Sequence, residues 1–152
     1  MSRRLPRVLF LCTGNSCRSQ MAEGWARALH PGRFAAASAG IETHGLNPRA
    51  VRAMAEAGVD ISHHASKTVA DLGTEPFDLV VTVCGHAHET CPVLPGAPRT
   101  LHRGFDDPPR LAAGLEDEEA AMAPYRRVRD EIRAFVAALP DLLDRVGEGD
   151  RP

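Results

Sequence analysis

The chain has 152 residues, and this length predicts a single domain over residues 1–152. Its 18 basic and 20 acidic side chains nearly balance, so we expect a small molecule as partner, with no nucleic acid and no membrane. No apolar run approaches the roughly 20 residues of a membrane helix, and the opening segment lacks the features of a signal peptide. We therefore expect a cytoplasmic protein, and a monomer. Its four cysteines point to catalytic, metal-binding or redox-active thiols rather than to a static disulfide framework.

The first predicted unit is a strand, a loop and a helix. Residues 8–11 form an apolar run without polar alternation, which is typical of a strand covered on both faces and so of a parallel sheet. Apolar side chains then recur at helical spacing over residues 21–29. This pattern predicts a helix that begins near Cys17 or Arg18.

A second strand and a second helix follow. Residues 34–37 favour a strand that the sequence "SAG" is expected to stop. Asn47 as a cap and Pro48 at the first helical position then predict a helix that ends around Gly58.

The second half of the chain alternates in the same way. "FDLVVTVC" predicts an interior strand at residues 79–83, and a weaker strand is expected at 99–102. Residues 103–110, "RGFDDPPR", are predicted to form a loop. Apolar positions then step by three or four over residues 123–143, so a helix is expected there, and Pro140 would end or bend it.

These elements predict an α/β fold with a small parallel four-stranded sheet flanked by helices. Right-handed crossovers would gather the loops at the carboxyl ends of the strands on one edge, and those loops contain Cys12, Cys84 and Asp107. The acidic stretch "GLEDEEAA" before the last helix is interpreted as a solvated loop or first turn, with no chemistry.

The loop after the first strand, within "LCTGNSCRS", has the composition of an anion-binding site. Its glycine, asparagine and serine allow successive backbone amides to turn inward, and the following helix adds positive potential at its N-terminus. The planar guanidinium of Arg18 can bind two oxygens at once. The sequence thus predicts a site for a tetrahedral oxyanion, formed by Thr13, Gly14, Asn15, Ser16, Cys17, Arg18 and Ser19.

The same positive field acts on the sulfur of Cys12. A cysteine at a helix N-terminus beside an arginine ionises more readily than a free one, so Cys12 is predicted to be a nucleophilic thiolate, to which Ser19 can donate a hydrogen bond. The spacing of Cys12 and Arg18 alone also arises by chance, and only its place between a strand and a helix favours function. Cys17 is interpreted as a small packed residue.

Cys84 and Cys91 stand seven residues apart after the interior strand. In a helix they would be about 10.5 Å apart along the axis, whereas a disulfide needs Cα atoms within about 7 Å. They could pair only if the segment unwound, which suits a transient disulfide. Zinc binding by Cys84, His86, His88 and Cys91 is one alternative, although their spacing matches no known zinc finger. Solvated histidines with buried thiols are another. We expect no metal.

"FDDPP" supplies a candidate general acid. Pro108 biases Asp107 towards an extended conformation, which would present its carboxylate from a loop, and Asp106 is the alternative. An aspartate that binds its own backbone in a turn is the structural alternative.

Four segments in order, "CTGNSCRSQMAEGWA", "SAGIETHGLNPRAV", "DLVVTVCGHAHETCP" and "GFDDP", resemble the thioredoxin-coupled arsenate reductases, which share the fold and the phosphate-binding loop of the low-molecular-weight tyrosine phosphatases. The resemblance implies that Cys12 attacks arsenate while Arg18 and the loop amides hold its oxygens, and that Asp107 protonates the departing hydroxyl. No cofactor is implied.

The resemblance also implies a disulfide cascade. Cys84 would attack Cys12 and release arsenite, Cys91 would attack Cys84, and thioredoxin would reduce the final pair. A phosphatase that uses Cys12, Arg18 and Asp107 is the nearest rival, and a sensor of an oxyanion or of redox state, through a cysteine and histidine metal site, is a more distant one.

Some members of this family bind potassium beside the anion loop through oxygen ligands. The matching positions here include Asn15, Glu23 and Ser38, but Lys67 stands where those members have an acidic residue. Because a fixed ammonium could replace the ion, no potassium site is expected.

Overall fold

The structure is a computed structural model that describes residues 5–85 and 99–149. Its elements in chain order are β1 (Arg7–Cys12), α1 (Arg18–Leu29), β2 (Ala35–Gly40), α2 (Pro48–Glu56), the 3-10 helix η1 (Val69–Leu72), β3 (Leu79–Thr82), β4 (Arg99–His102), α4 (Pro108–Ala112) and α5 (Glu118–Gly149). This order confirms the predicted alternation of strands and helices. In the described part of the chain, no helix is long and apolar enough to span a membrane.

The four strands form one parallel sheet in the order β2-β1-β3-β4. Val8 of β1 pairs with Ala36 of β2 on one side and with Leu79 of β3 on the other. The apolar run of β1 is fully buried, as expected of a strand covered on both faces. The interior position of β1 brings its carboxyl end beside those of β2 and β3.

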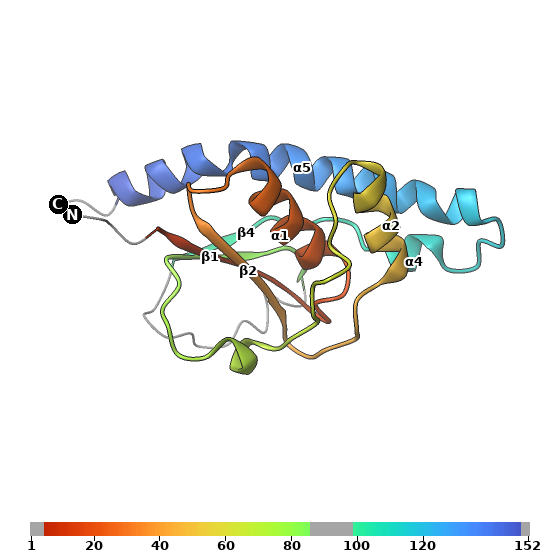
Figure 1. The fold of residues 1–152 in the computed structure, drawn as a ribbon, viewed down its shortest axis with the longest axis horizontal. Coiled ribbons are helices and arrows are strands. Elements are labelled where there is room, and N and C mark those ends of the chain that lie inside the picture. The colour runs from red at the N-terminus through yellow and green to blue at the C-terminus, as the bar shows by residue number, and fades with distance from the viewer. Residues whose placement is uncertain (1–4, 86–98, 150–152) are drawn as a thin grey trace.

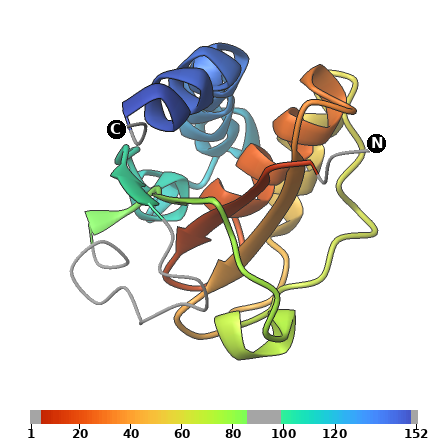
Figure 2. The same cartoon turned by 90° about the vertical axis from the view of Figure 1, so that its left-hand side faces the viewer.

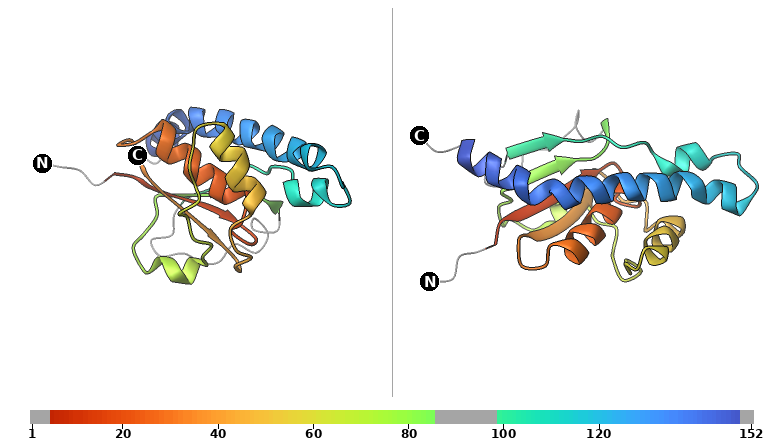
Figure 3. Two further views of the ribbon diagram at one scale, coloured as in Figure 1. Left: turned by 45° about the vertical axis from the view of Figure 1, so that its right-hand side comes forward. Right: turned by 90° about the horizontal axis from the view of Figure 1, so that it is seen from above.

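The helices α1, α2 and α5 lie on the same side of the sheet, and η1 lies on the opposite side from α5 (Figures 1 and 2). Helix α5 runs along the length of the molecule above α1 and α2, as the view from above shows (Figure 3). Its buried face is the predicted apolar stripe, with Tyr125, Val128, Ile132, Val136 and Leu139. Burial of that stripe against α1 attaches α5 to the sheet.

The first half of the fold differs most from the prediction at the ends of β2 and α2. Strand β2 does not stop at "SAG" but continues to Gly40, which pairs with Cys12, because backbone pairing with β1 outweighs the weak β-propensity of these residues. A Cβ atom at Gly40 would lie 2.3 Å from the Glu42 carbonyl oxygen, so this glycine permits close approach of two backbones. Helix α2 ends at Glu56, before Gly58 with its φ of +86°.

The second half differs at three places. Residues 103–110 are not all loop, since α4 begins at Pro108, whose fixed φ suits a first helical turn. Helix α5 is longer than the predicted 123–143, and Pro140 does not end it. Packing of the apolar stripe outweighs the local cost of proline there. Strand β3 ends at Thr82, one residue before the predicted end.

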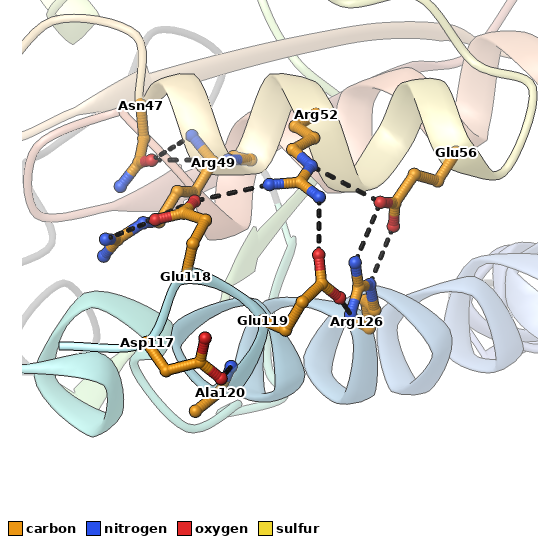
Figure 4. Close-up of polar contacts among 10 residues, drawn as sticks. Asn47, Arg49, Arg52, Glu56, Asp117, Glu118, Glu119, Ala120 and Arg126 are labelled. Atoms are coloured by element: carbon orange, nitrogen blue, oxygen red, sulfur yellow. Dashed lines mark hydrogen bonds and ion pairs between the residues drawn. The ribbon is translucent and has the colours of Figure 1, made fainter. Parts of the chain in front are cut away.

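The acidic start of α5 is attached to α2 by ion pairs (Figure 4). Arg52 Nη2 lies 2.8 Å from Glu119 Oε1, and Arg126 Nε donates to Glu56 Oε1 at 2.8 Å. The first turn of a helix favours acidic side chains, as the sequence analysis expected of this stretch. The pairs fix α2 against α5, and the N-terminus of α2 borders the site described next.

Candidate active site

The loop between β1 and α1 turns its carbonyl groups away from the space that it encloses. Each of four loop carbonyls accepts a hydrogen bond from the segment of residues 41–47: Ile41 N to Cys12 O at 3.2 Å, Glu42 N to Thr13 O at 3.0 Å, His44 N to Gly14 O at 3.0 Å, and Asn47 N to Ser16 O at 3.0 Å. Within the described residues, the amides of residues 14–17 donate to no protein group. Successive unpaired amides at the start of a helix can bind an anion.

Asn15 stabilises the conformation of this loop from the side away from the pocket. Its φ of +49° lies in the left-handed region, which asparagine tolerates better than most residues. Its side-chain Oδ1 accepts hydrogen bonds from Gln20 Nε2 and from the Lys67 amide, each at 2.9 Å, and its Nδ2 donates to Ser19 Oγ at 2.9 Å. All polar atoms of this buried side chain are therefore used within the protein, so Asn15 supports the loop through its backbone and does not reach the pocket.

Cys12 lies at the end of β1 with its sulfur 2.8 Å from Ser19 Oγ. Ser19 already accepts a hydrogen bond from Asn15, so its single hydroxyl hydrogen is free to point towards the Cys12 sulfur. A donated hydrogen bond of this kind stabilises a thiolate more than a thiol. The contact between Cys12 and Ser19 agrees with the sequence expectation.

Arg18, the first residue of α1, turns its guanidinium to the same pocket. Its Nη1 donates to the Phe105 carbonyl oxygen at 2.9 Å, and its Nη2 lies 3.6 Å from Asp107 Oδ1. These two contacts fix the planar group between the loop and the segment before α4.

The two candidate acids lie in different places. Asp107 has an extended backbone, with φ −91° and ψ 103°, as Pro108 after it predicts, and its carboxylate faces the pocket. Asp106 instead pairs with Arg127 at 3.0 Å on the exposed surface. The geometry therefore favours Asp107 over Asp106 as a group that can reach a bound anion.

The other cysteines differ in their surroundings. Cys84, which follows β3, is buried and its sulfur lies 3.3 Å from Thr13 Oγ1, next to the anion loop. Burial raises the pKa of the Cys17 thiol, which supports its interpretation as a packed residue. Cys91, like His86 and His88, lies outside the described residues, so the structure does not test its predicted pairing with Cys84.

A pocket of about 360 Å³ joins these groups. It is lined by Cys12, Thr13, Gly14, Ser16, Cys17, Arg18, His44, Asn47, Asp107 and Pro109. The sequence analysis did not assign His44 or Pro109 to the site and gave Asn47 only the role of a helix cap, which it also fills by accepting from the amides of Arg49 and Ala50. The sequence could have indicated these residues, because residues 41–47 directly follow β2, whose carboxyl end adjoins that of β1.

The positions that matched potassium ligands form a polar cluster behind the loop. Glu23 is buried, and its carboxylate accepts a hydrogen bond from Ser38 Oγ at 2.7 Å. Arg27 Nη2 lies 3.0 Å from Glu23 Oε2, and Lys67 Nζ lies 3.7 Å from Glu23 Oε1. Two cationic side chains thus face the carboxylate. Among the described residues, no three histidine, cysteine, aspartate or glutamate side chains gather as a metal-ligand set.

The low molecular weight phosphotyrosine protein phosphatase family matches residues 7–148. The chain belongs to this family. A Bacillus subtilis protein named arsenate reductase is 53% identical over 125 residues, which cover 82% of this chain and 88% of that protein.

Solved structures of the family share the fold. An arsenate reductase in a phosphate-binding state has 30% identity and a TM-score of 0.68, and the match covers 91% of this chain and 99% of that one. The Corynebacterium glutamicum thioredoxin-dependent arsenate reductase has a TM-score of 0.70 at 24% identity, with 96% of this chain and 65% of that chain covered, which shows the fold alone. The predicted fold class and the resemblance to arsenate reductases of this family are confirmed.

Proposed function

We propose that this protein reduces arsenate to arsenite in the cytoplasm, with Cys12 as the nucleophile. One observation carries the proposal: the Cys12 sulfur opens into a pocket lined by the anion loop and Arg18, while the second buried thiol, Cys84, lies against Thr13 of the same loop. The identity to the Bacillus subtilis arsenate reductase supports arsenate as the substrate.

In the first step, the loop amides of residues 13–19 and the guanidinium of Arg18 hold the oxygens of arsenate. The Cys12 thiolate attacks the arsenic atom, and a sulfur–arsenic bond forms while one As–O bond breaks. Asp107, in its protonated form, gives its proton to the departing hydroxyl, which leaves as water. The extended backbone of Asp107 and the 3.6 Å distance from its Oδ1 to Arg18 Nη2 support its position beside the bound anion, within reach of the departing oxygen.

In the second step, the Cys84 thiolate attacks the Cys12 sulfur. The sulfur–arsenic bond breaks, and its electron pair stays with arsenic, which leaves as arsenite in the trivalent state. A disulfide joins Cys12 and Cys84. The contact of the Cys84 sulfur with Thr13 at 3.3 Å supports this attack, because it holds the second thiol beside the anion loop.

In the third step, Cys91 attacks Cys84 and releases the Cys12 thiolate. Thioredoxin then supplies two electrons and reduces the disulfide of Cys84 and Cys91. The resemblance of four segments of this chain to the thioredoxin-coupled arsenate reductases supports thioredoxin as the reductant.

Hydrolysis of phosphate esters is a second candidate function. The family match supports it, and the pocket contains the three groups that this reaction needs: Cys12, Arg18 and Asp107. Cys84 and Cys91 would be dispensable for that reaction, which separates the two functions by mutation.

An arsenate-dependent NADPH oxidation assay with thioredoxin and thioredoxin reductase tests the proposal. We expect oxidation only when all three proteins and arsenate are present, and omission of thioredoxin separates this coupling from reduction by a small thiol. Trapping of thiols and mass spectrometry after exposure to arsenate provides an independent measurement. If all four sulfurs stay reduced, the protein does not reduce arsenate by this route.

A further inference from the structure

His44 lies on the wall of the pocket, in contact with the anion loop. Its amide donates to the Gly14 carbonyl oxygen at 3.0 Å, and its ring lies directly over the Gly14 α-carbon. A Cβ atom at Gly14 would be only 2.2 Å from the ring atom Nδ1 and 2.5 Å from Cγ. The ring therefore occupies space that only a glycine at position 14 leaves open.

Glu42 lies beside the outer end of the same ring. Its Oε1 lies 3.3 Å from His44 Nε2, and both side chains are about half exposed. His44 thus makes three contacts: its backbone amide with the Gly14 carbonyl oxygen, the Nδ1 edge of its ring with the Gly14 α-carbon, and its Nε2 with Glu42. The carboxylate also offsets any positive charge on the ring, so His44 acts on a ligand mainly through its bulk.

The position of the ring limits the space for the fourth substituent of a bound tetrahedral anion. The loop amides can hold oxygens at the base of the pocket, so the remaining substituent points towards the residues outside the loop: His44, Asn47, Asp107 and Pro109. The pocket volume of about 360 Å³ is near the lower end of the range of roughly 300 to 1,000 Å³ for small-molecule sites. A hydroxyl needs little space there, whereas an aryl group must displace part of this rim.

We propose that His44 is a specificity-determining residue, whose ring, seated on Gly14 and held by Glu42, narrows the rim of the pocket and selects an inorganic oxyanion against an aryl ester. The inference deepens the proposed function, since it rests on the Cys12 pocket as the oxyanion site. It assigns to this residue a part in substrate choice and no part in the bond-breaking steps.

Isothermal titration of the reduced protein with inorganic phosphate and with phenylphosphonate tests the proposal without turnover. For His44→Ala, we expect the Kd for phenylphosphonate to fall about tenfold, in the range that one small group in a pocket contributes, while the Kd for phosphate changes less than about threefold. His44→Gln keeps most of the bulk and should stay within about twofold of the wild type for both ligands.

His63→Ala is the matched control. His63 is exposed and lines a separate pocket of about 290 Å³ between α1 and the segment after α2, which shares no residue with the Cys12 pocket. This variant should leave both Kd values unchanged. Should His44→Ala fail to fold, as judged by circular dichroism, Glu42→Gln provides the second variant, since it frees the ring and should lower the Kd for phenylphosphonate by a smaller factor.

Two results would overturn the assignment of His44. An unchanged ratio of the two Kd values in folded His44→Ala would show that the ring does not narrow the pocket. An equal gain in His44→Gln would attribute the effect to the imidazole itself and not to its bulk. Either result leaves arsenate reduction by the wild type intact, whereas absence of that activity would contradict the proposed function and leave the titrations unaffected.

Discussion

Asn15 Nδ2 donates a hydrogen bond to Ser19 Oγ at 2.9 Å, and this bond leaves the hydroxyl hydrogen of Ser19 available to Cys12. A hydroxyl that already accepts in this way keeps its one hydrogen for another partner, and the Cys12 sulfur lies 2.8 Å away. Ser19 can therefore donate this hydrogen to Cys12 whether or not an anion is bound.

Replacement of that donor should slow the reaction of Cys12. In Ser19→Ala, the thiolate loses a hydrogen bond of the charge-assisted kind, which is worth about 1.5 to 3 kcal/mol, so we expect alkylation of Cys12 by iodoacetamide at pH 7 to slow by about tenfold or more. Mass spectrometry locates the label. Ser62→Ala, at an exposed serine bonded to Asp60, is the control and should react like the wild type. An unchanged rate in Ser19→Ala would contradict the assigned direction of the bond.

The two neighbouring aspartates should differ in their effect on catalysis. Asp107 faces the pocket beside Arg18, whereas Asp106 pairs with Arg127 on the surface. We expect Asp107→Asn to lower kcat for arsenate by about a hundredfold or more, as loss of a general acid does, and Asp106→Asn to change it by less than about threefold. Steady-state kinetics of both variants measures this. The reverse ranking would transfer the role of acid to Asp106.

The sequence predicted the parts of this site that depend on local chemistry. The strand, the loop and the start of α1 at Arg18 follow from an apolar run, turn-forming residues and helical spacing, and Asn47 with Pro48 marked the start of α2. Local patterns could not predict the continuation of β2 to Gly40, because that depends on pairing with β1. The position of His44 over Gly14 was missed for the same reason, since it results from contact between two segments.

Gly40 should therefore be intolerant of a larger side chain. A Cβ atom there would lie 2.3 Å from the Glu42 carbonyl oxygen, 2.7 Å from the Thr13 carbonyl oxygen and 2.8 Å from the Asn15 amide nitrogen, all of which are backbone atoms. We expect Gly40→Ala to lower the free energy of unfolding by about 3 kcal/mol, at the upper end for an overpacked site, and to weaken phosphate binding more than tenfold. Urea denaturation and calorimetric titration measure the two effects.

Gly32→Ala provides the comparison for Gly40. Gly32 has a φ of +87° but no atom within 4 Å of a Cβ atom at that position, so only backbone strain of about 1 to 2 kcal/mol should appear, with phosphate binding unchanged. If the two variants lost equal stability and bound phosphate equally well, the close approach at Gly40 would have no part in shaping the loop.

The ion pair of Arg126 with Glu56, which connects α5 to α2, should affect the titration of Glu56 at acidic pH. The side-chain hydrogen bond from Arg126 holds the pKa of the Glu56 carboxyl below its ordinary value. A lowered pKa in the folded state contributes stability above the ordinary carboxyl pKa, and that contribution is lost as the pH falls through the lowered one. In Arg126→Gln, carbon-detected NMR should show the titration of Glu56 moving to higher pH, while Arg110→Gln, at an exposed site on α4, should not move it.

Cys84 and Cys91 should be needed for arsenate reduction but not for hydrolysis of phosphate esters. Cys84 lies beside the anion loop but does not line the pocket, and the proposed cascade uses Cys84 and Cys91 only after the sulfur–arsenic bond has formed. We expect Cys84→Ser and Cys91→Ser each to abolish multiple turnover with arsenate and to leave any hydrolysis of aryl phosphate within about threefold of the wild type. Cys12→Ser should abolish both, because both reactions begin with attack by its sulfur. Parallel loss of the two activities in the Cys84 and Cys91 variants would contradict the cascade, since hydrolysis leaves no oxidised sulfur for a second thiol to remove.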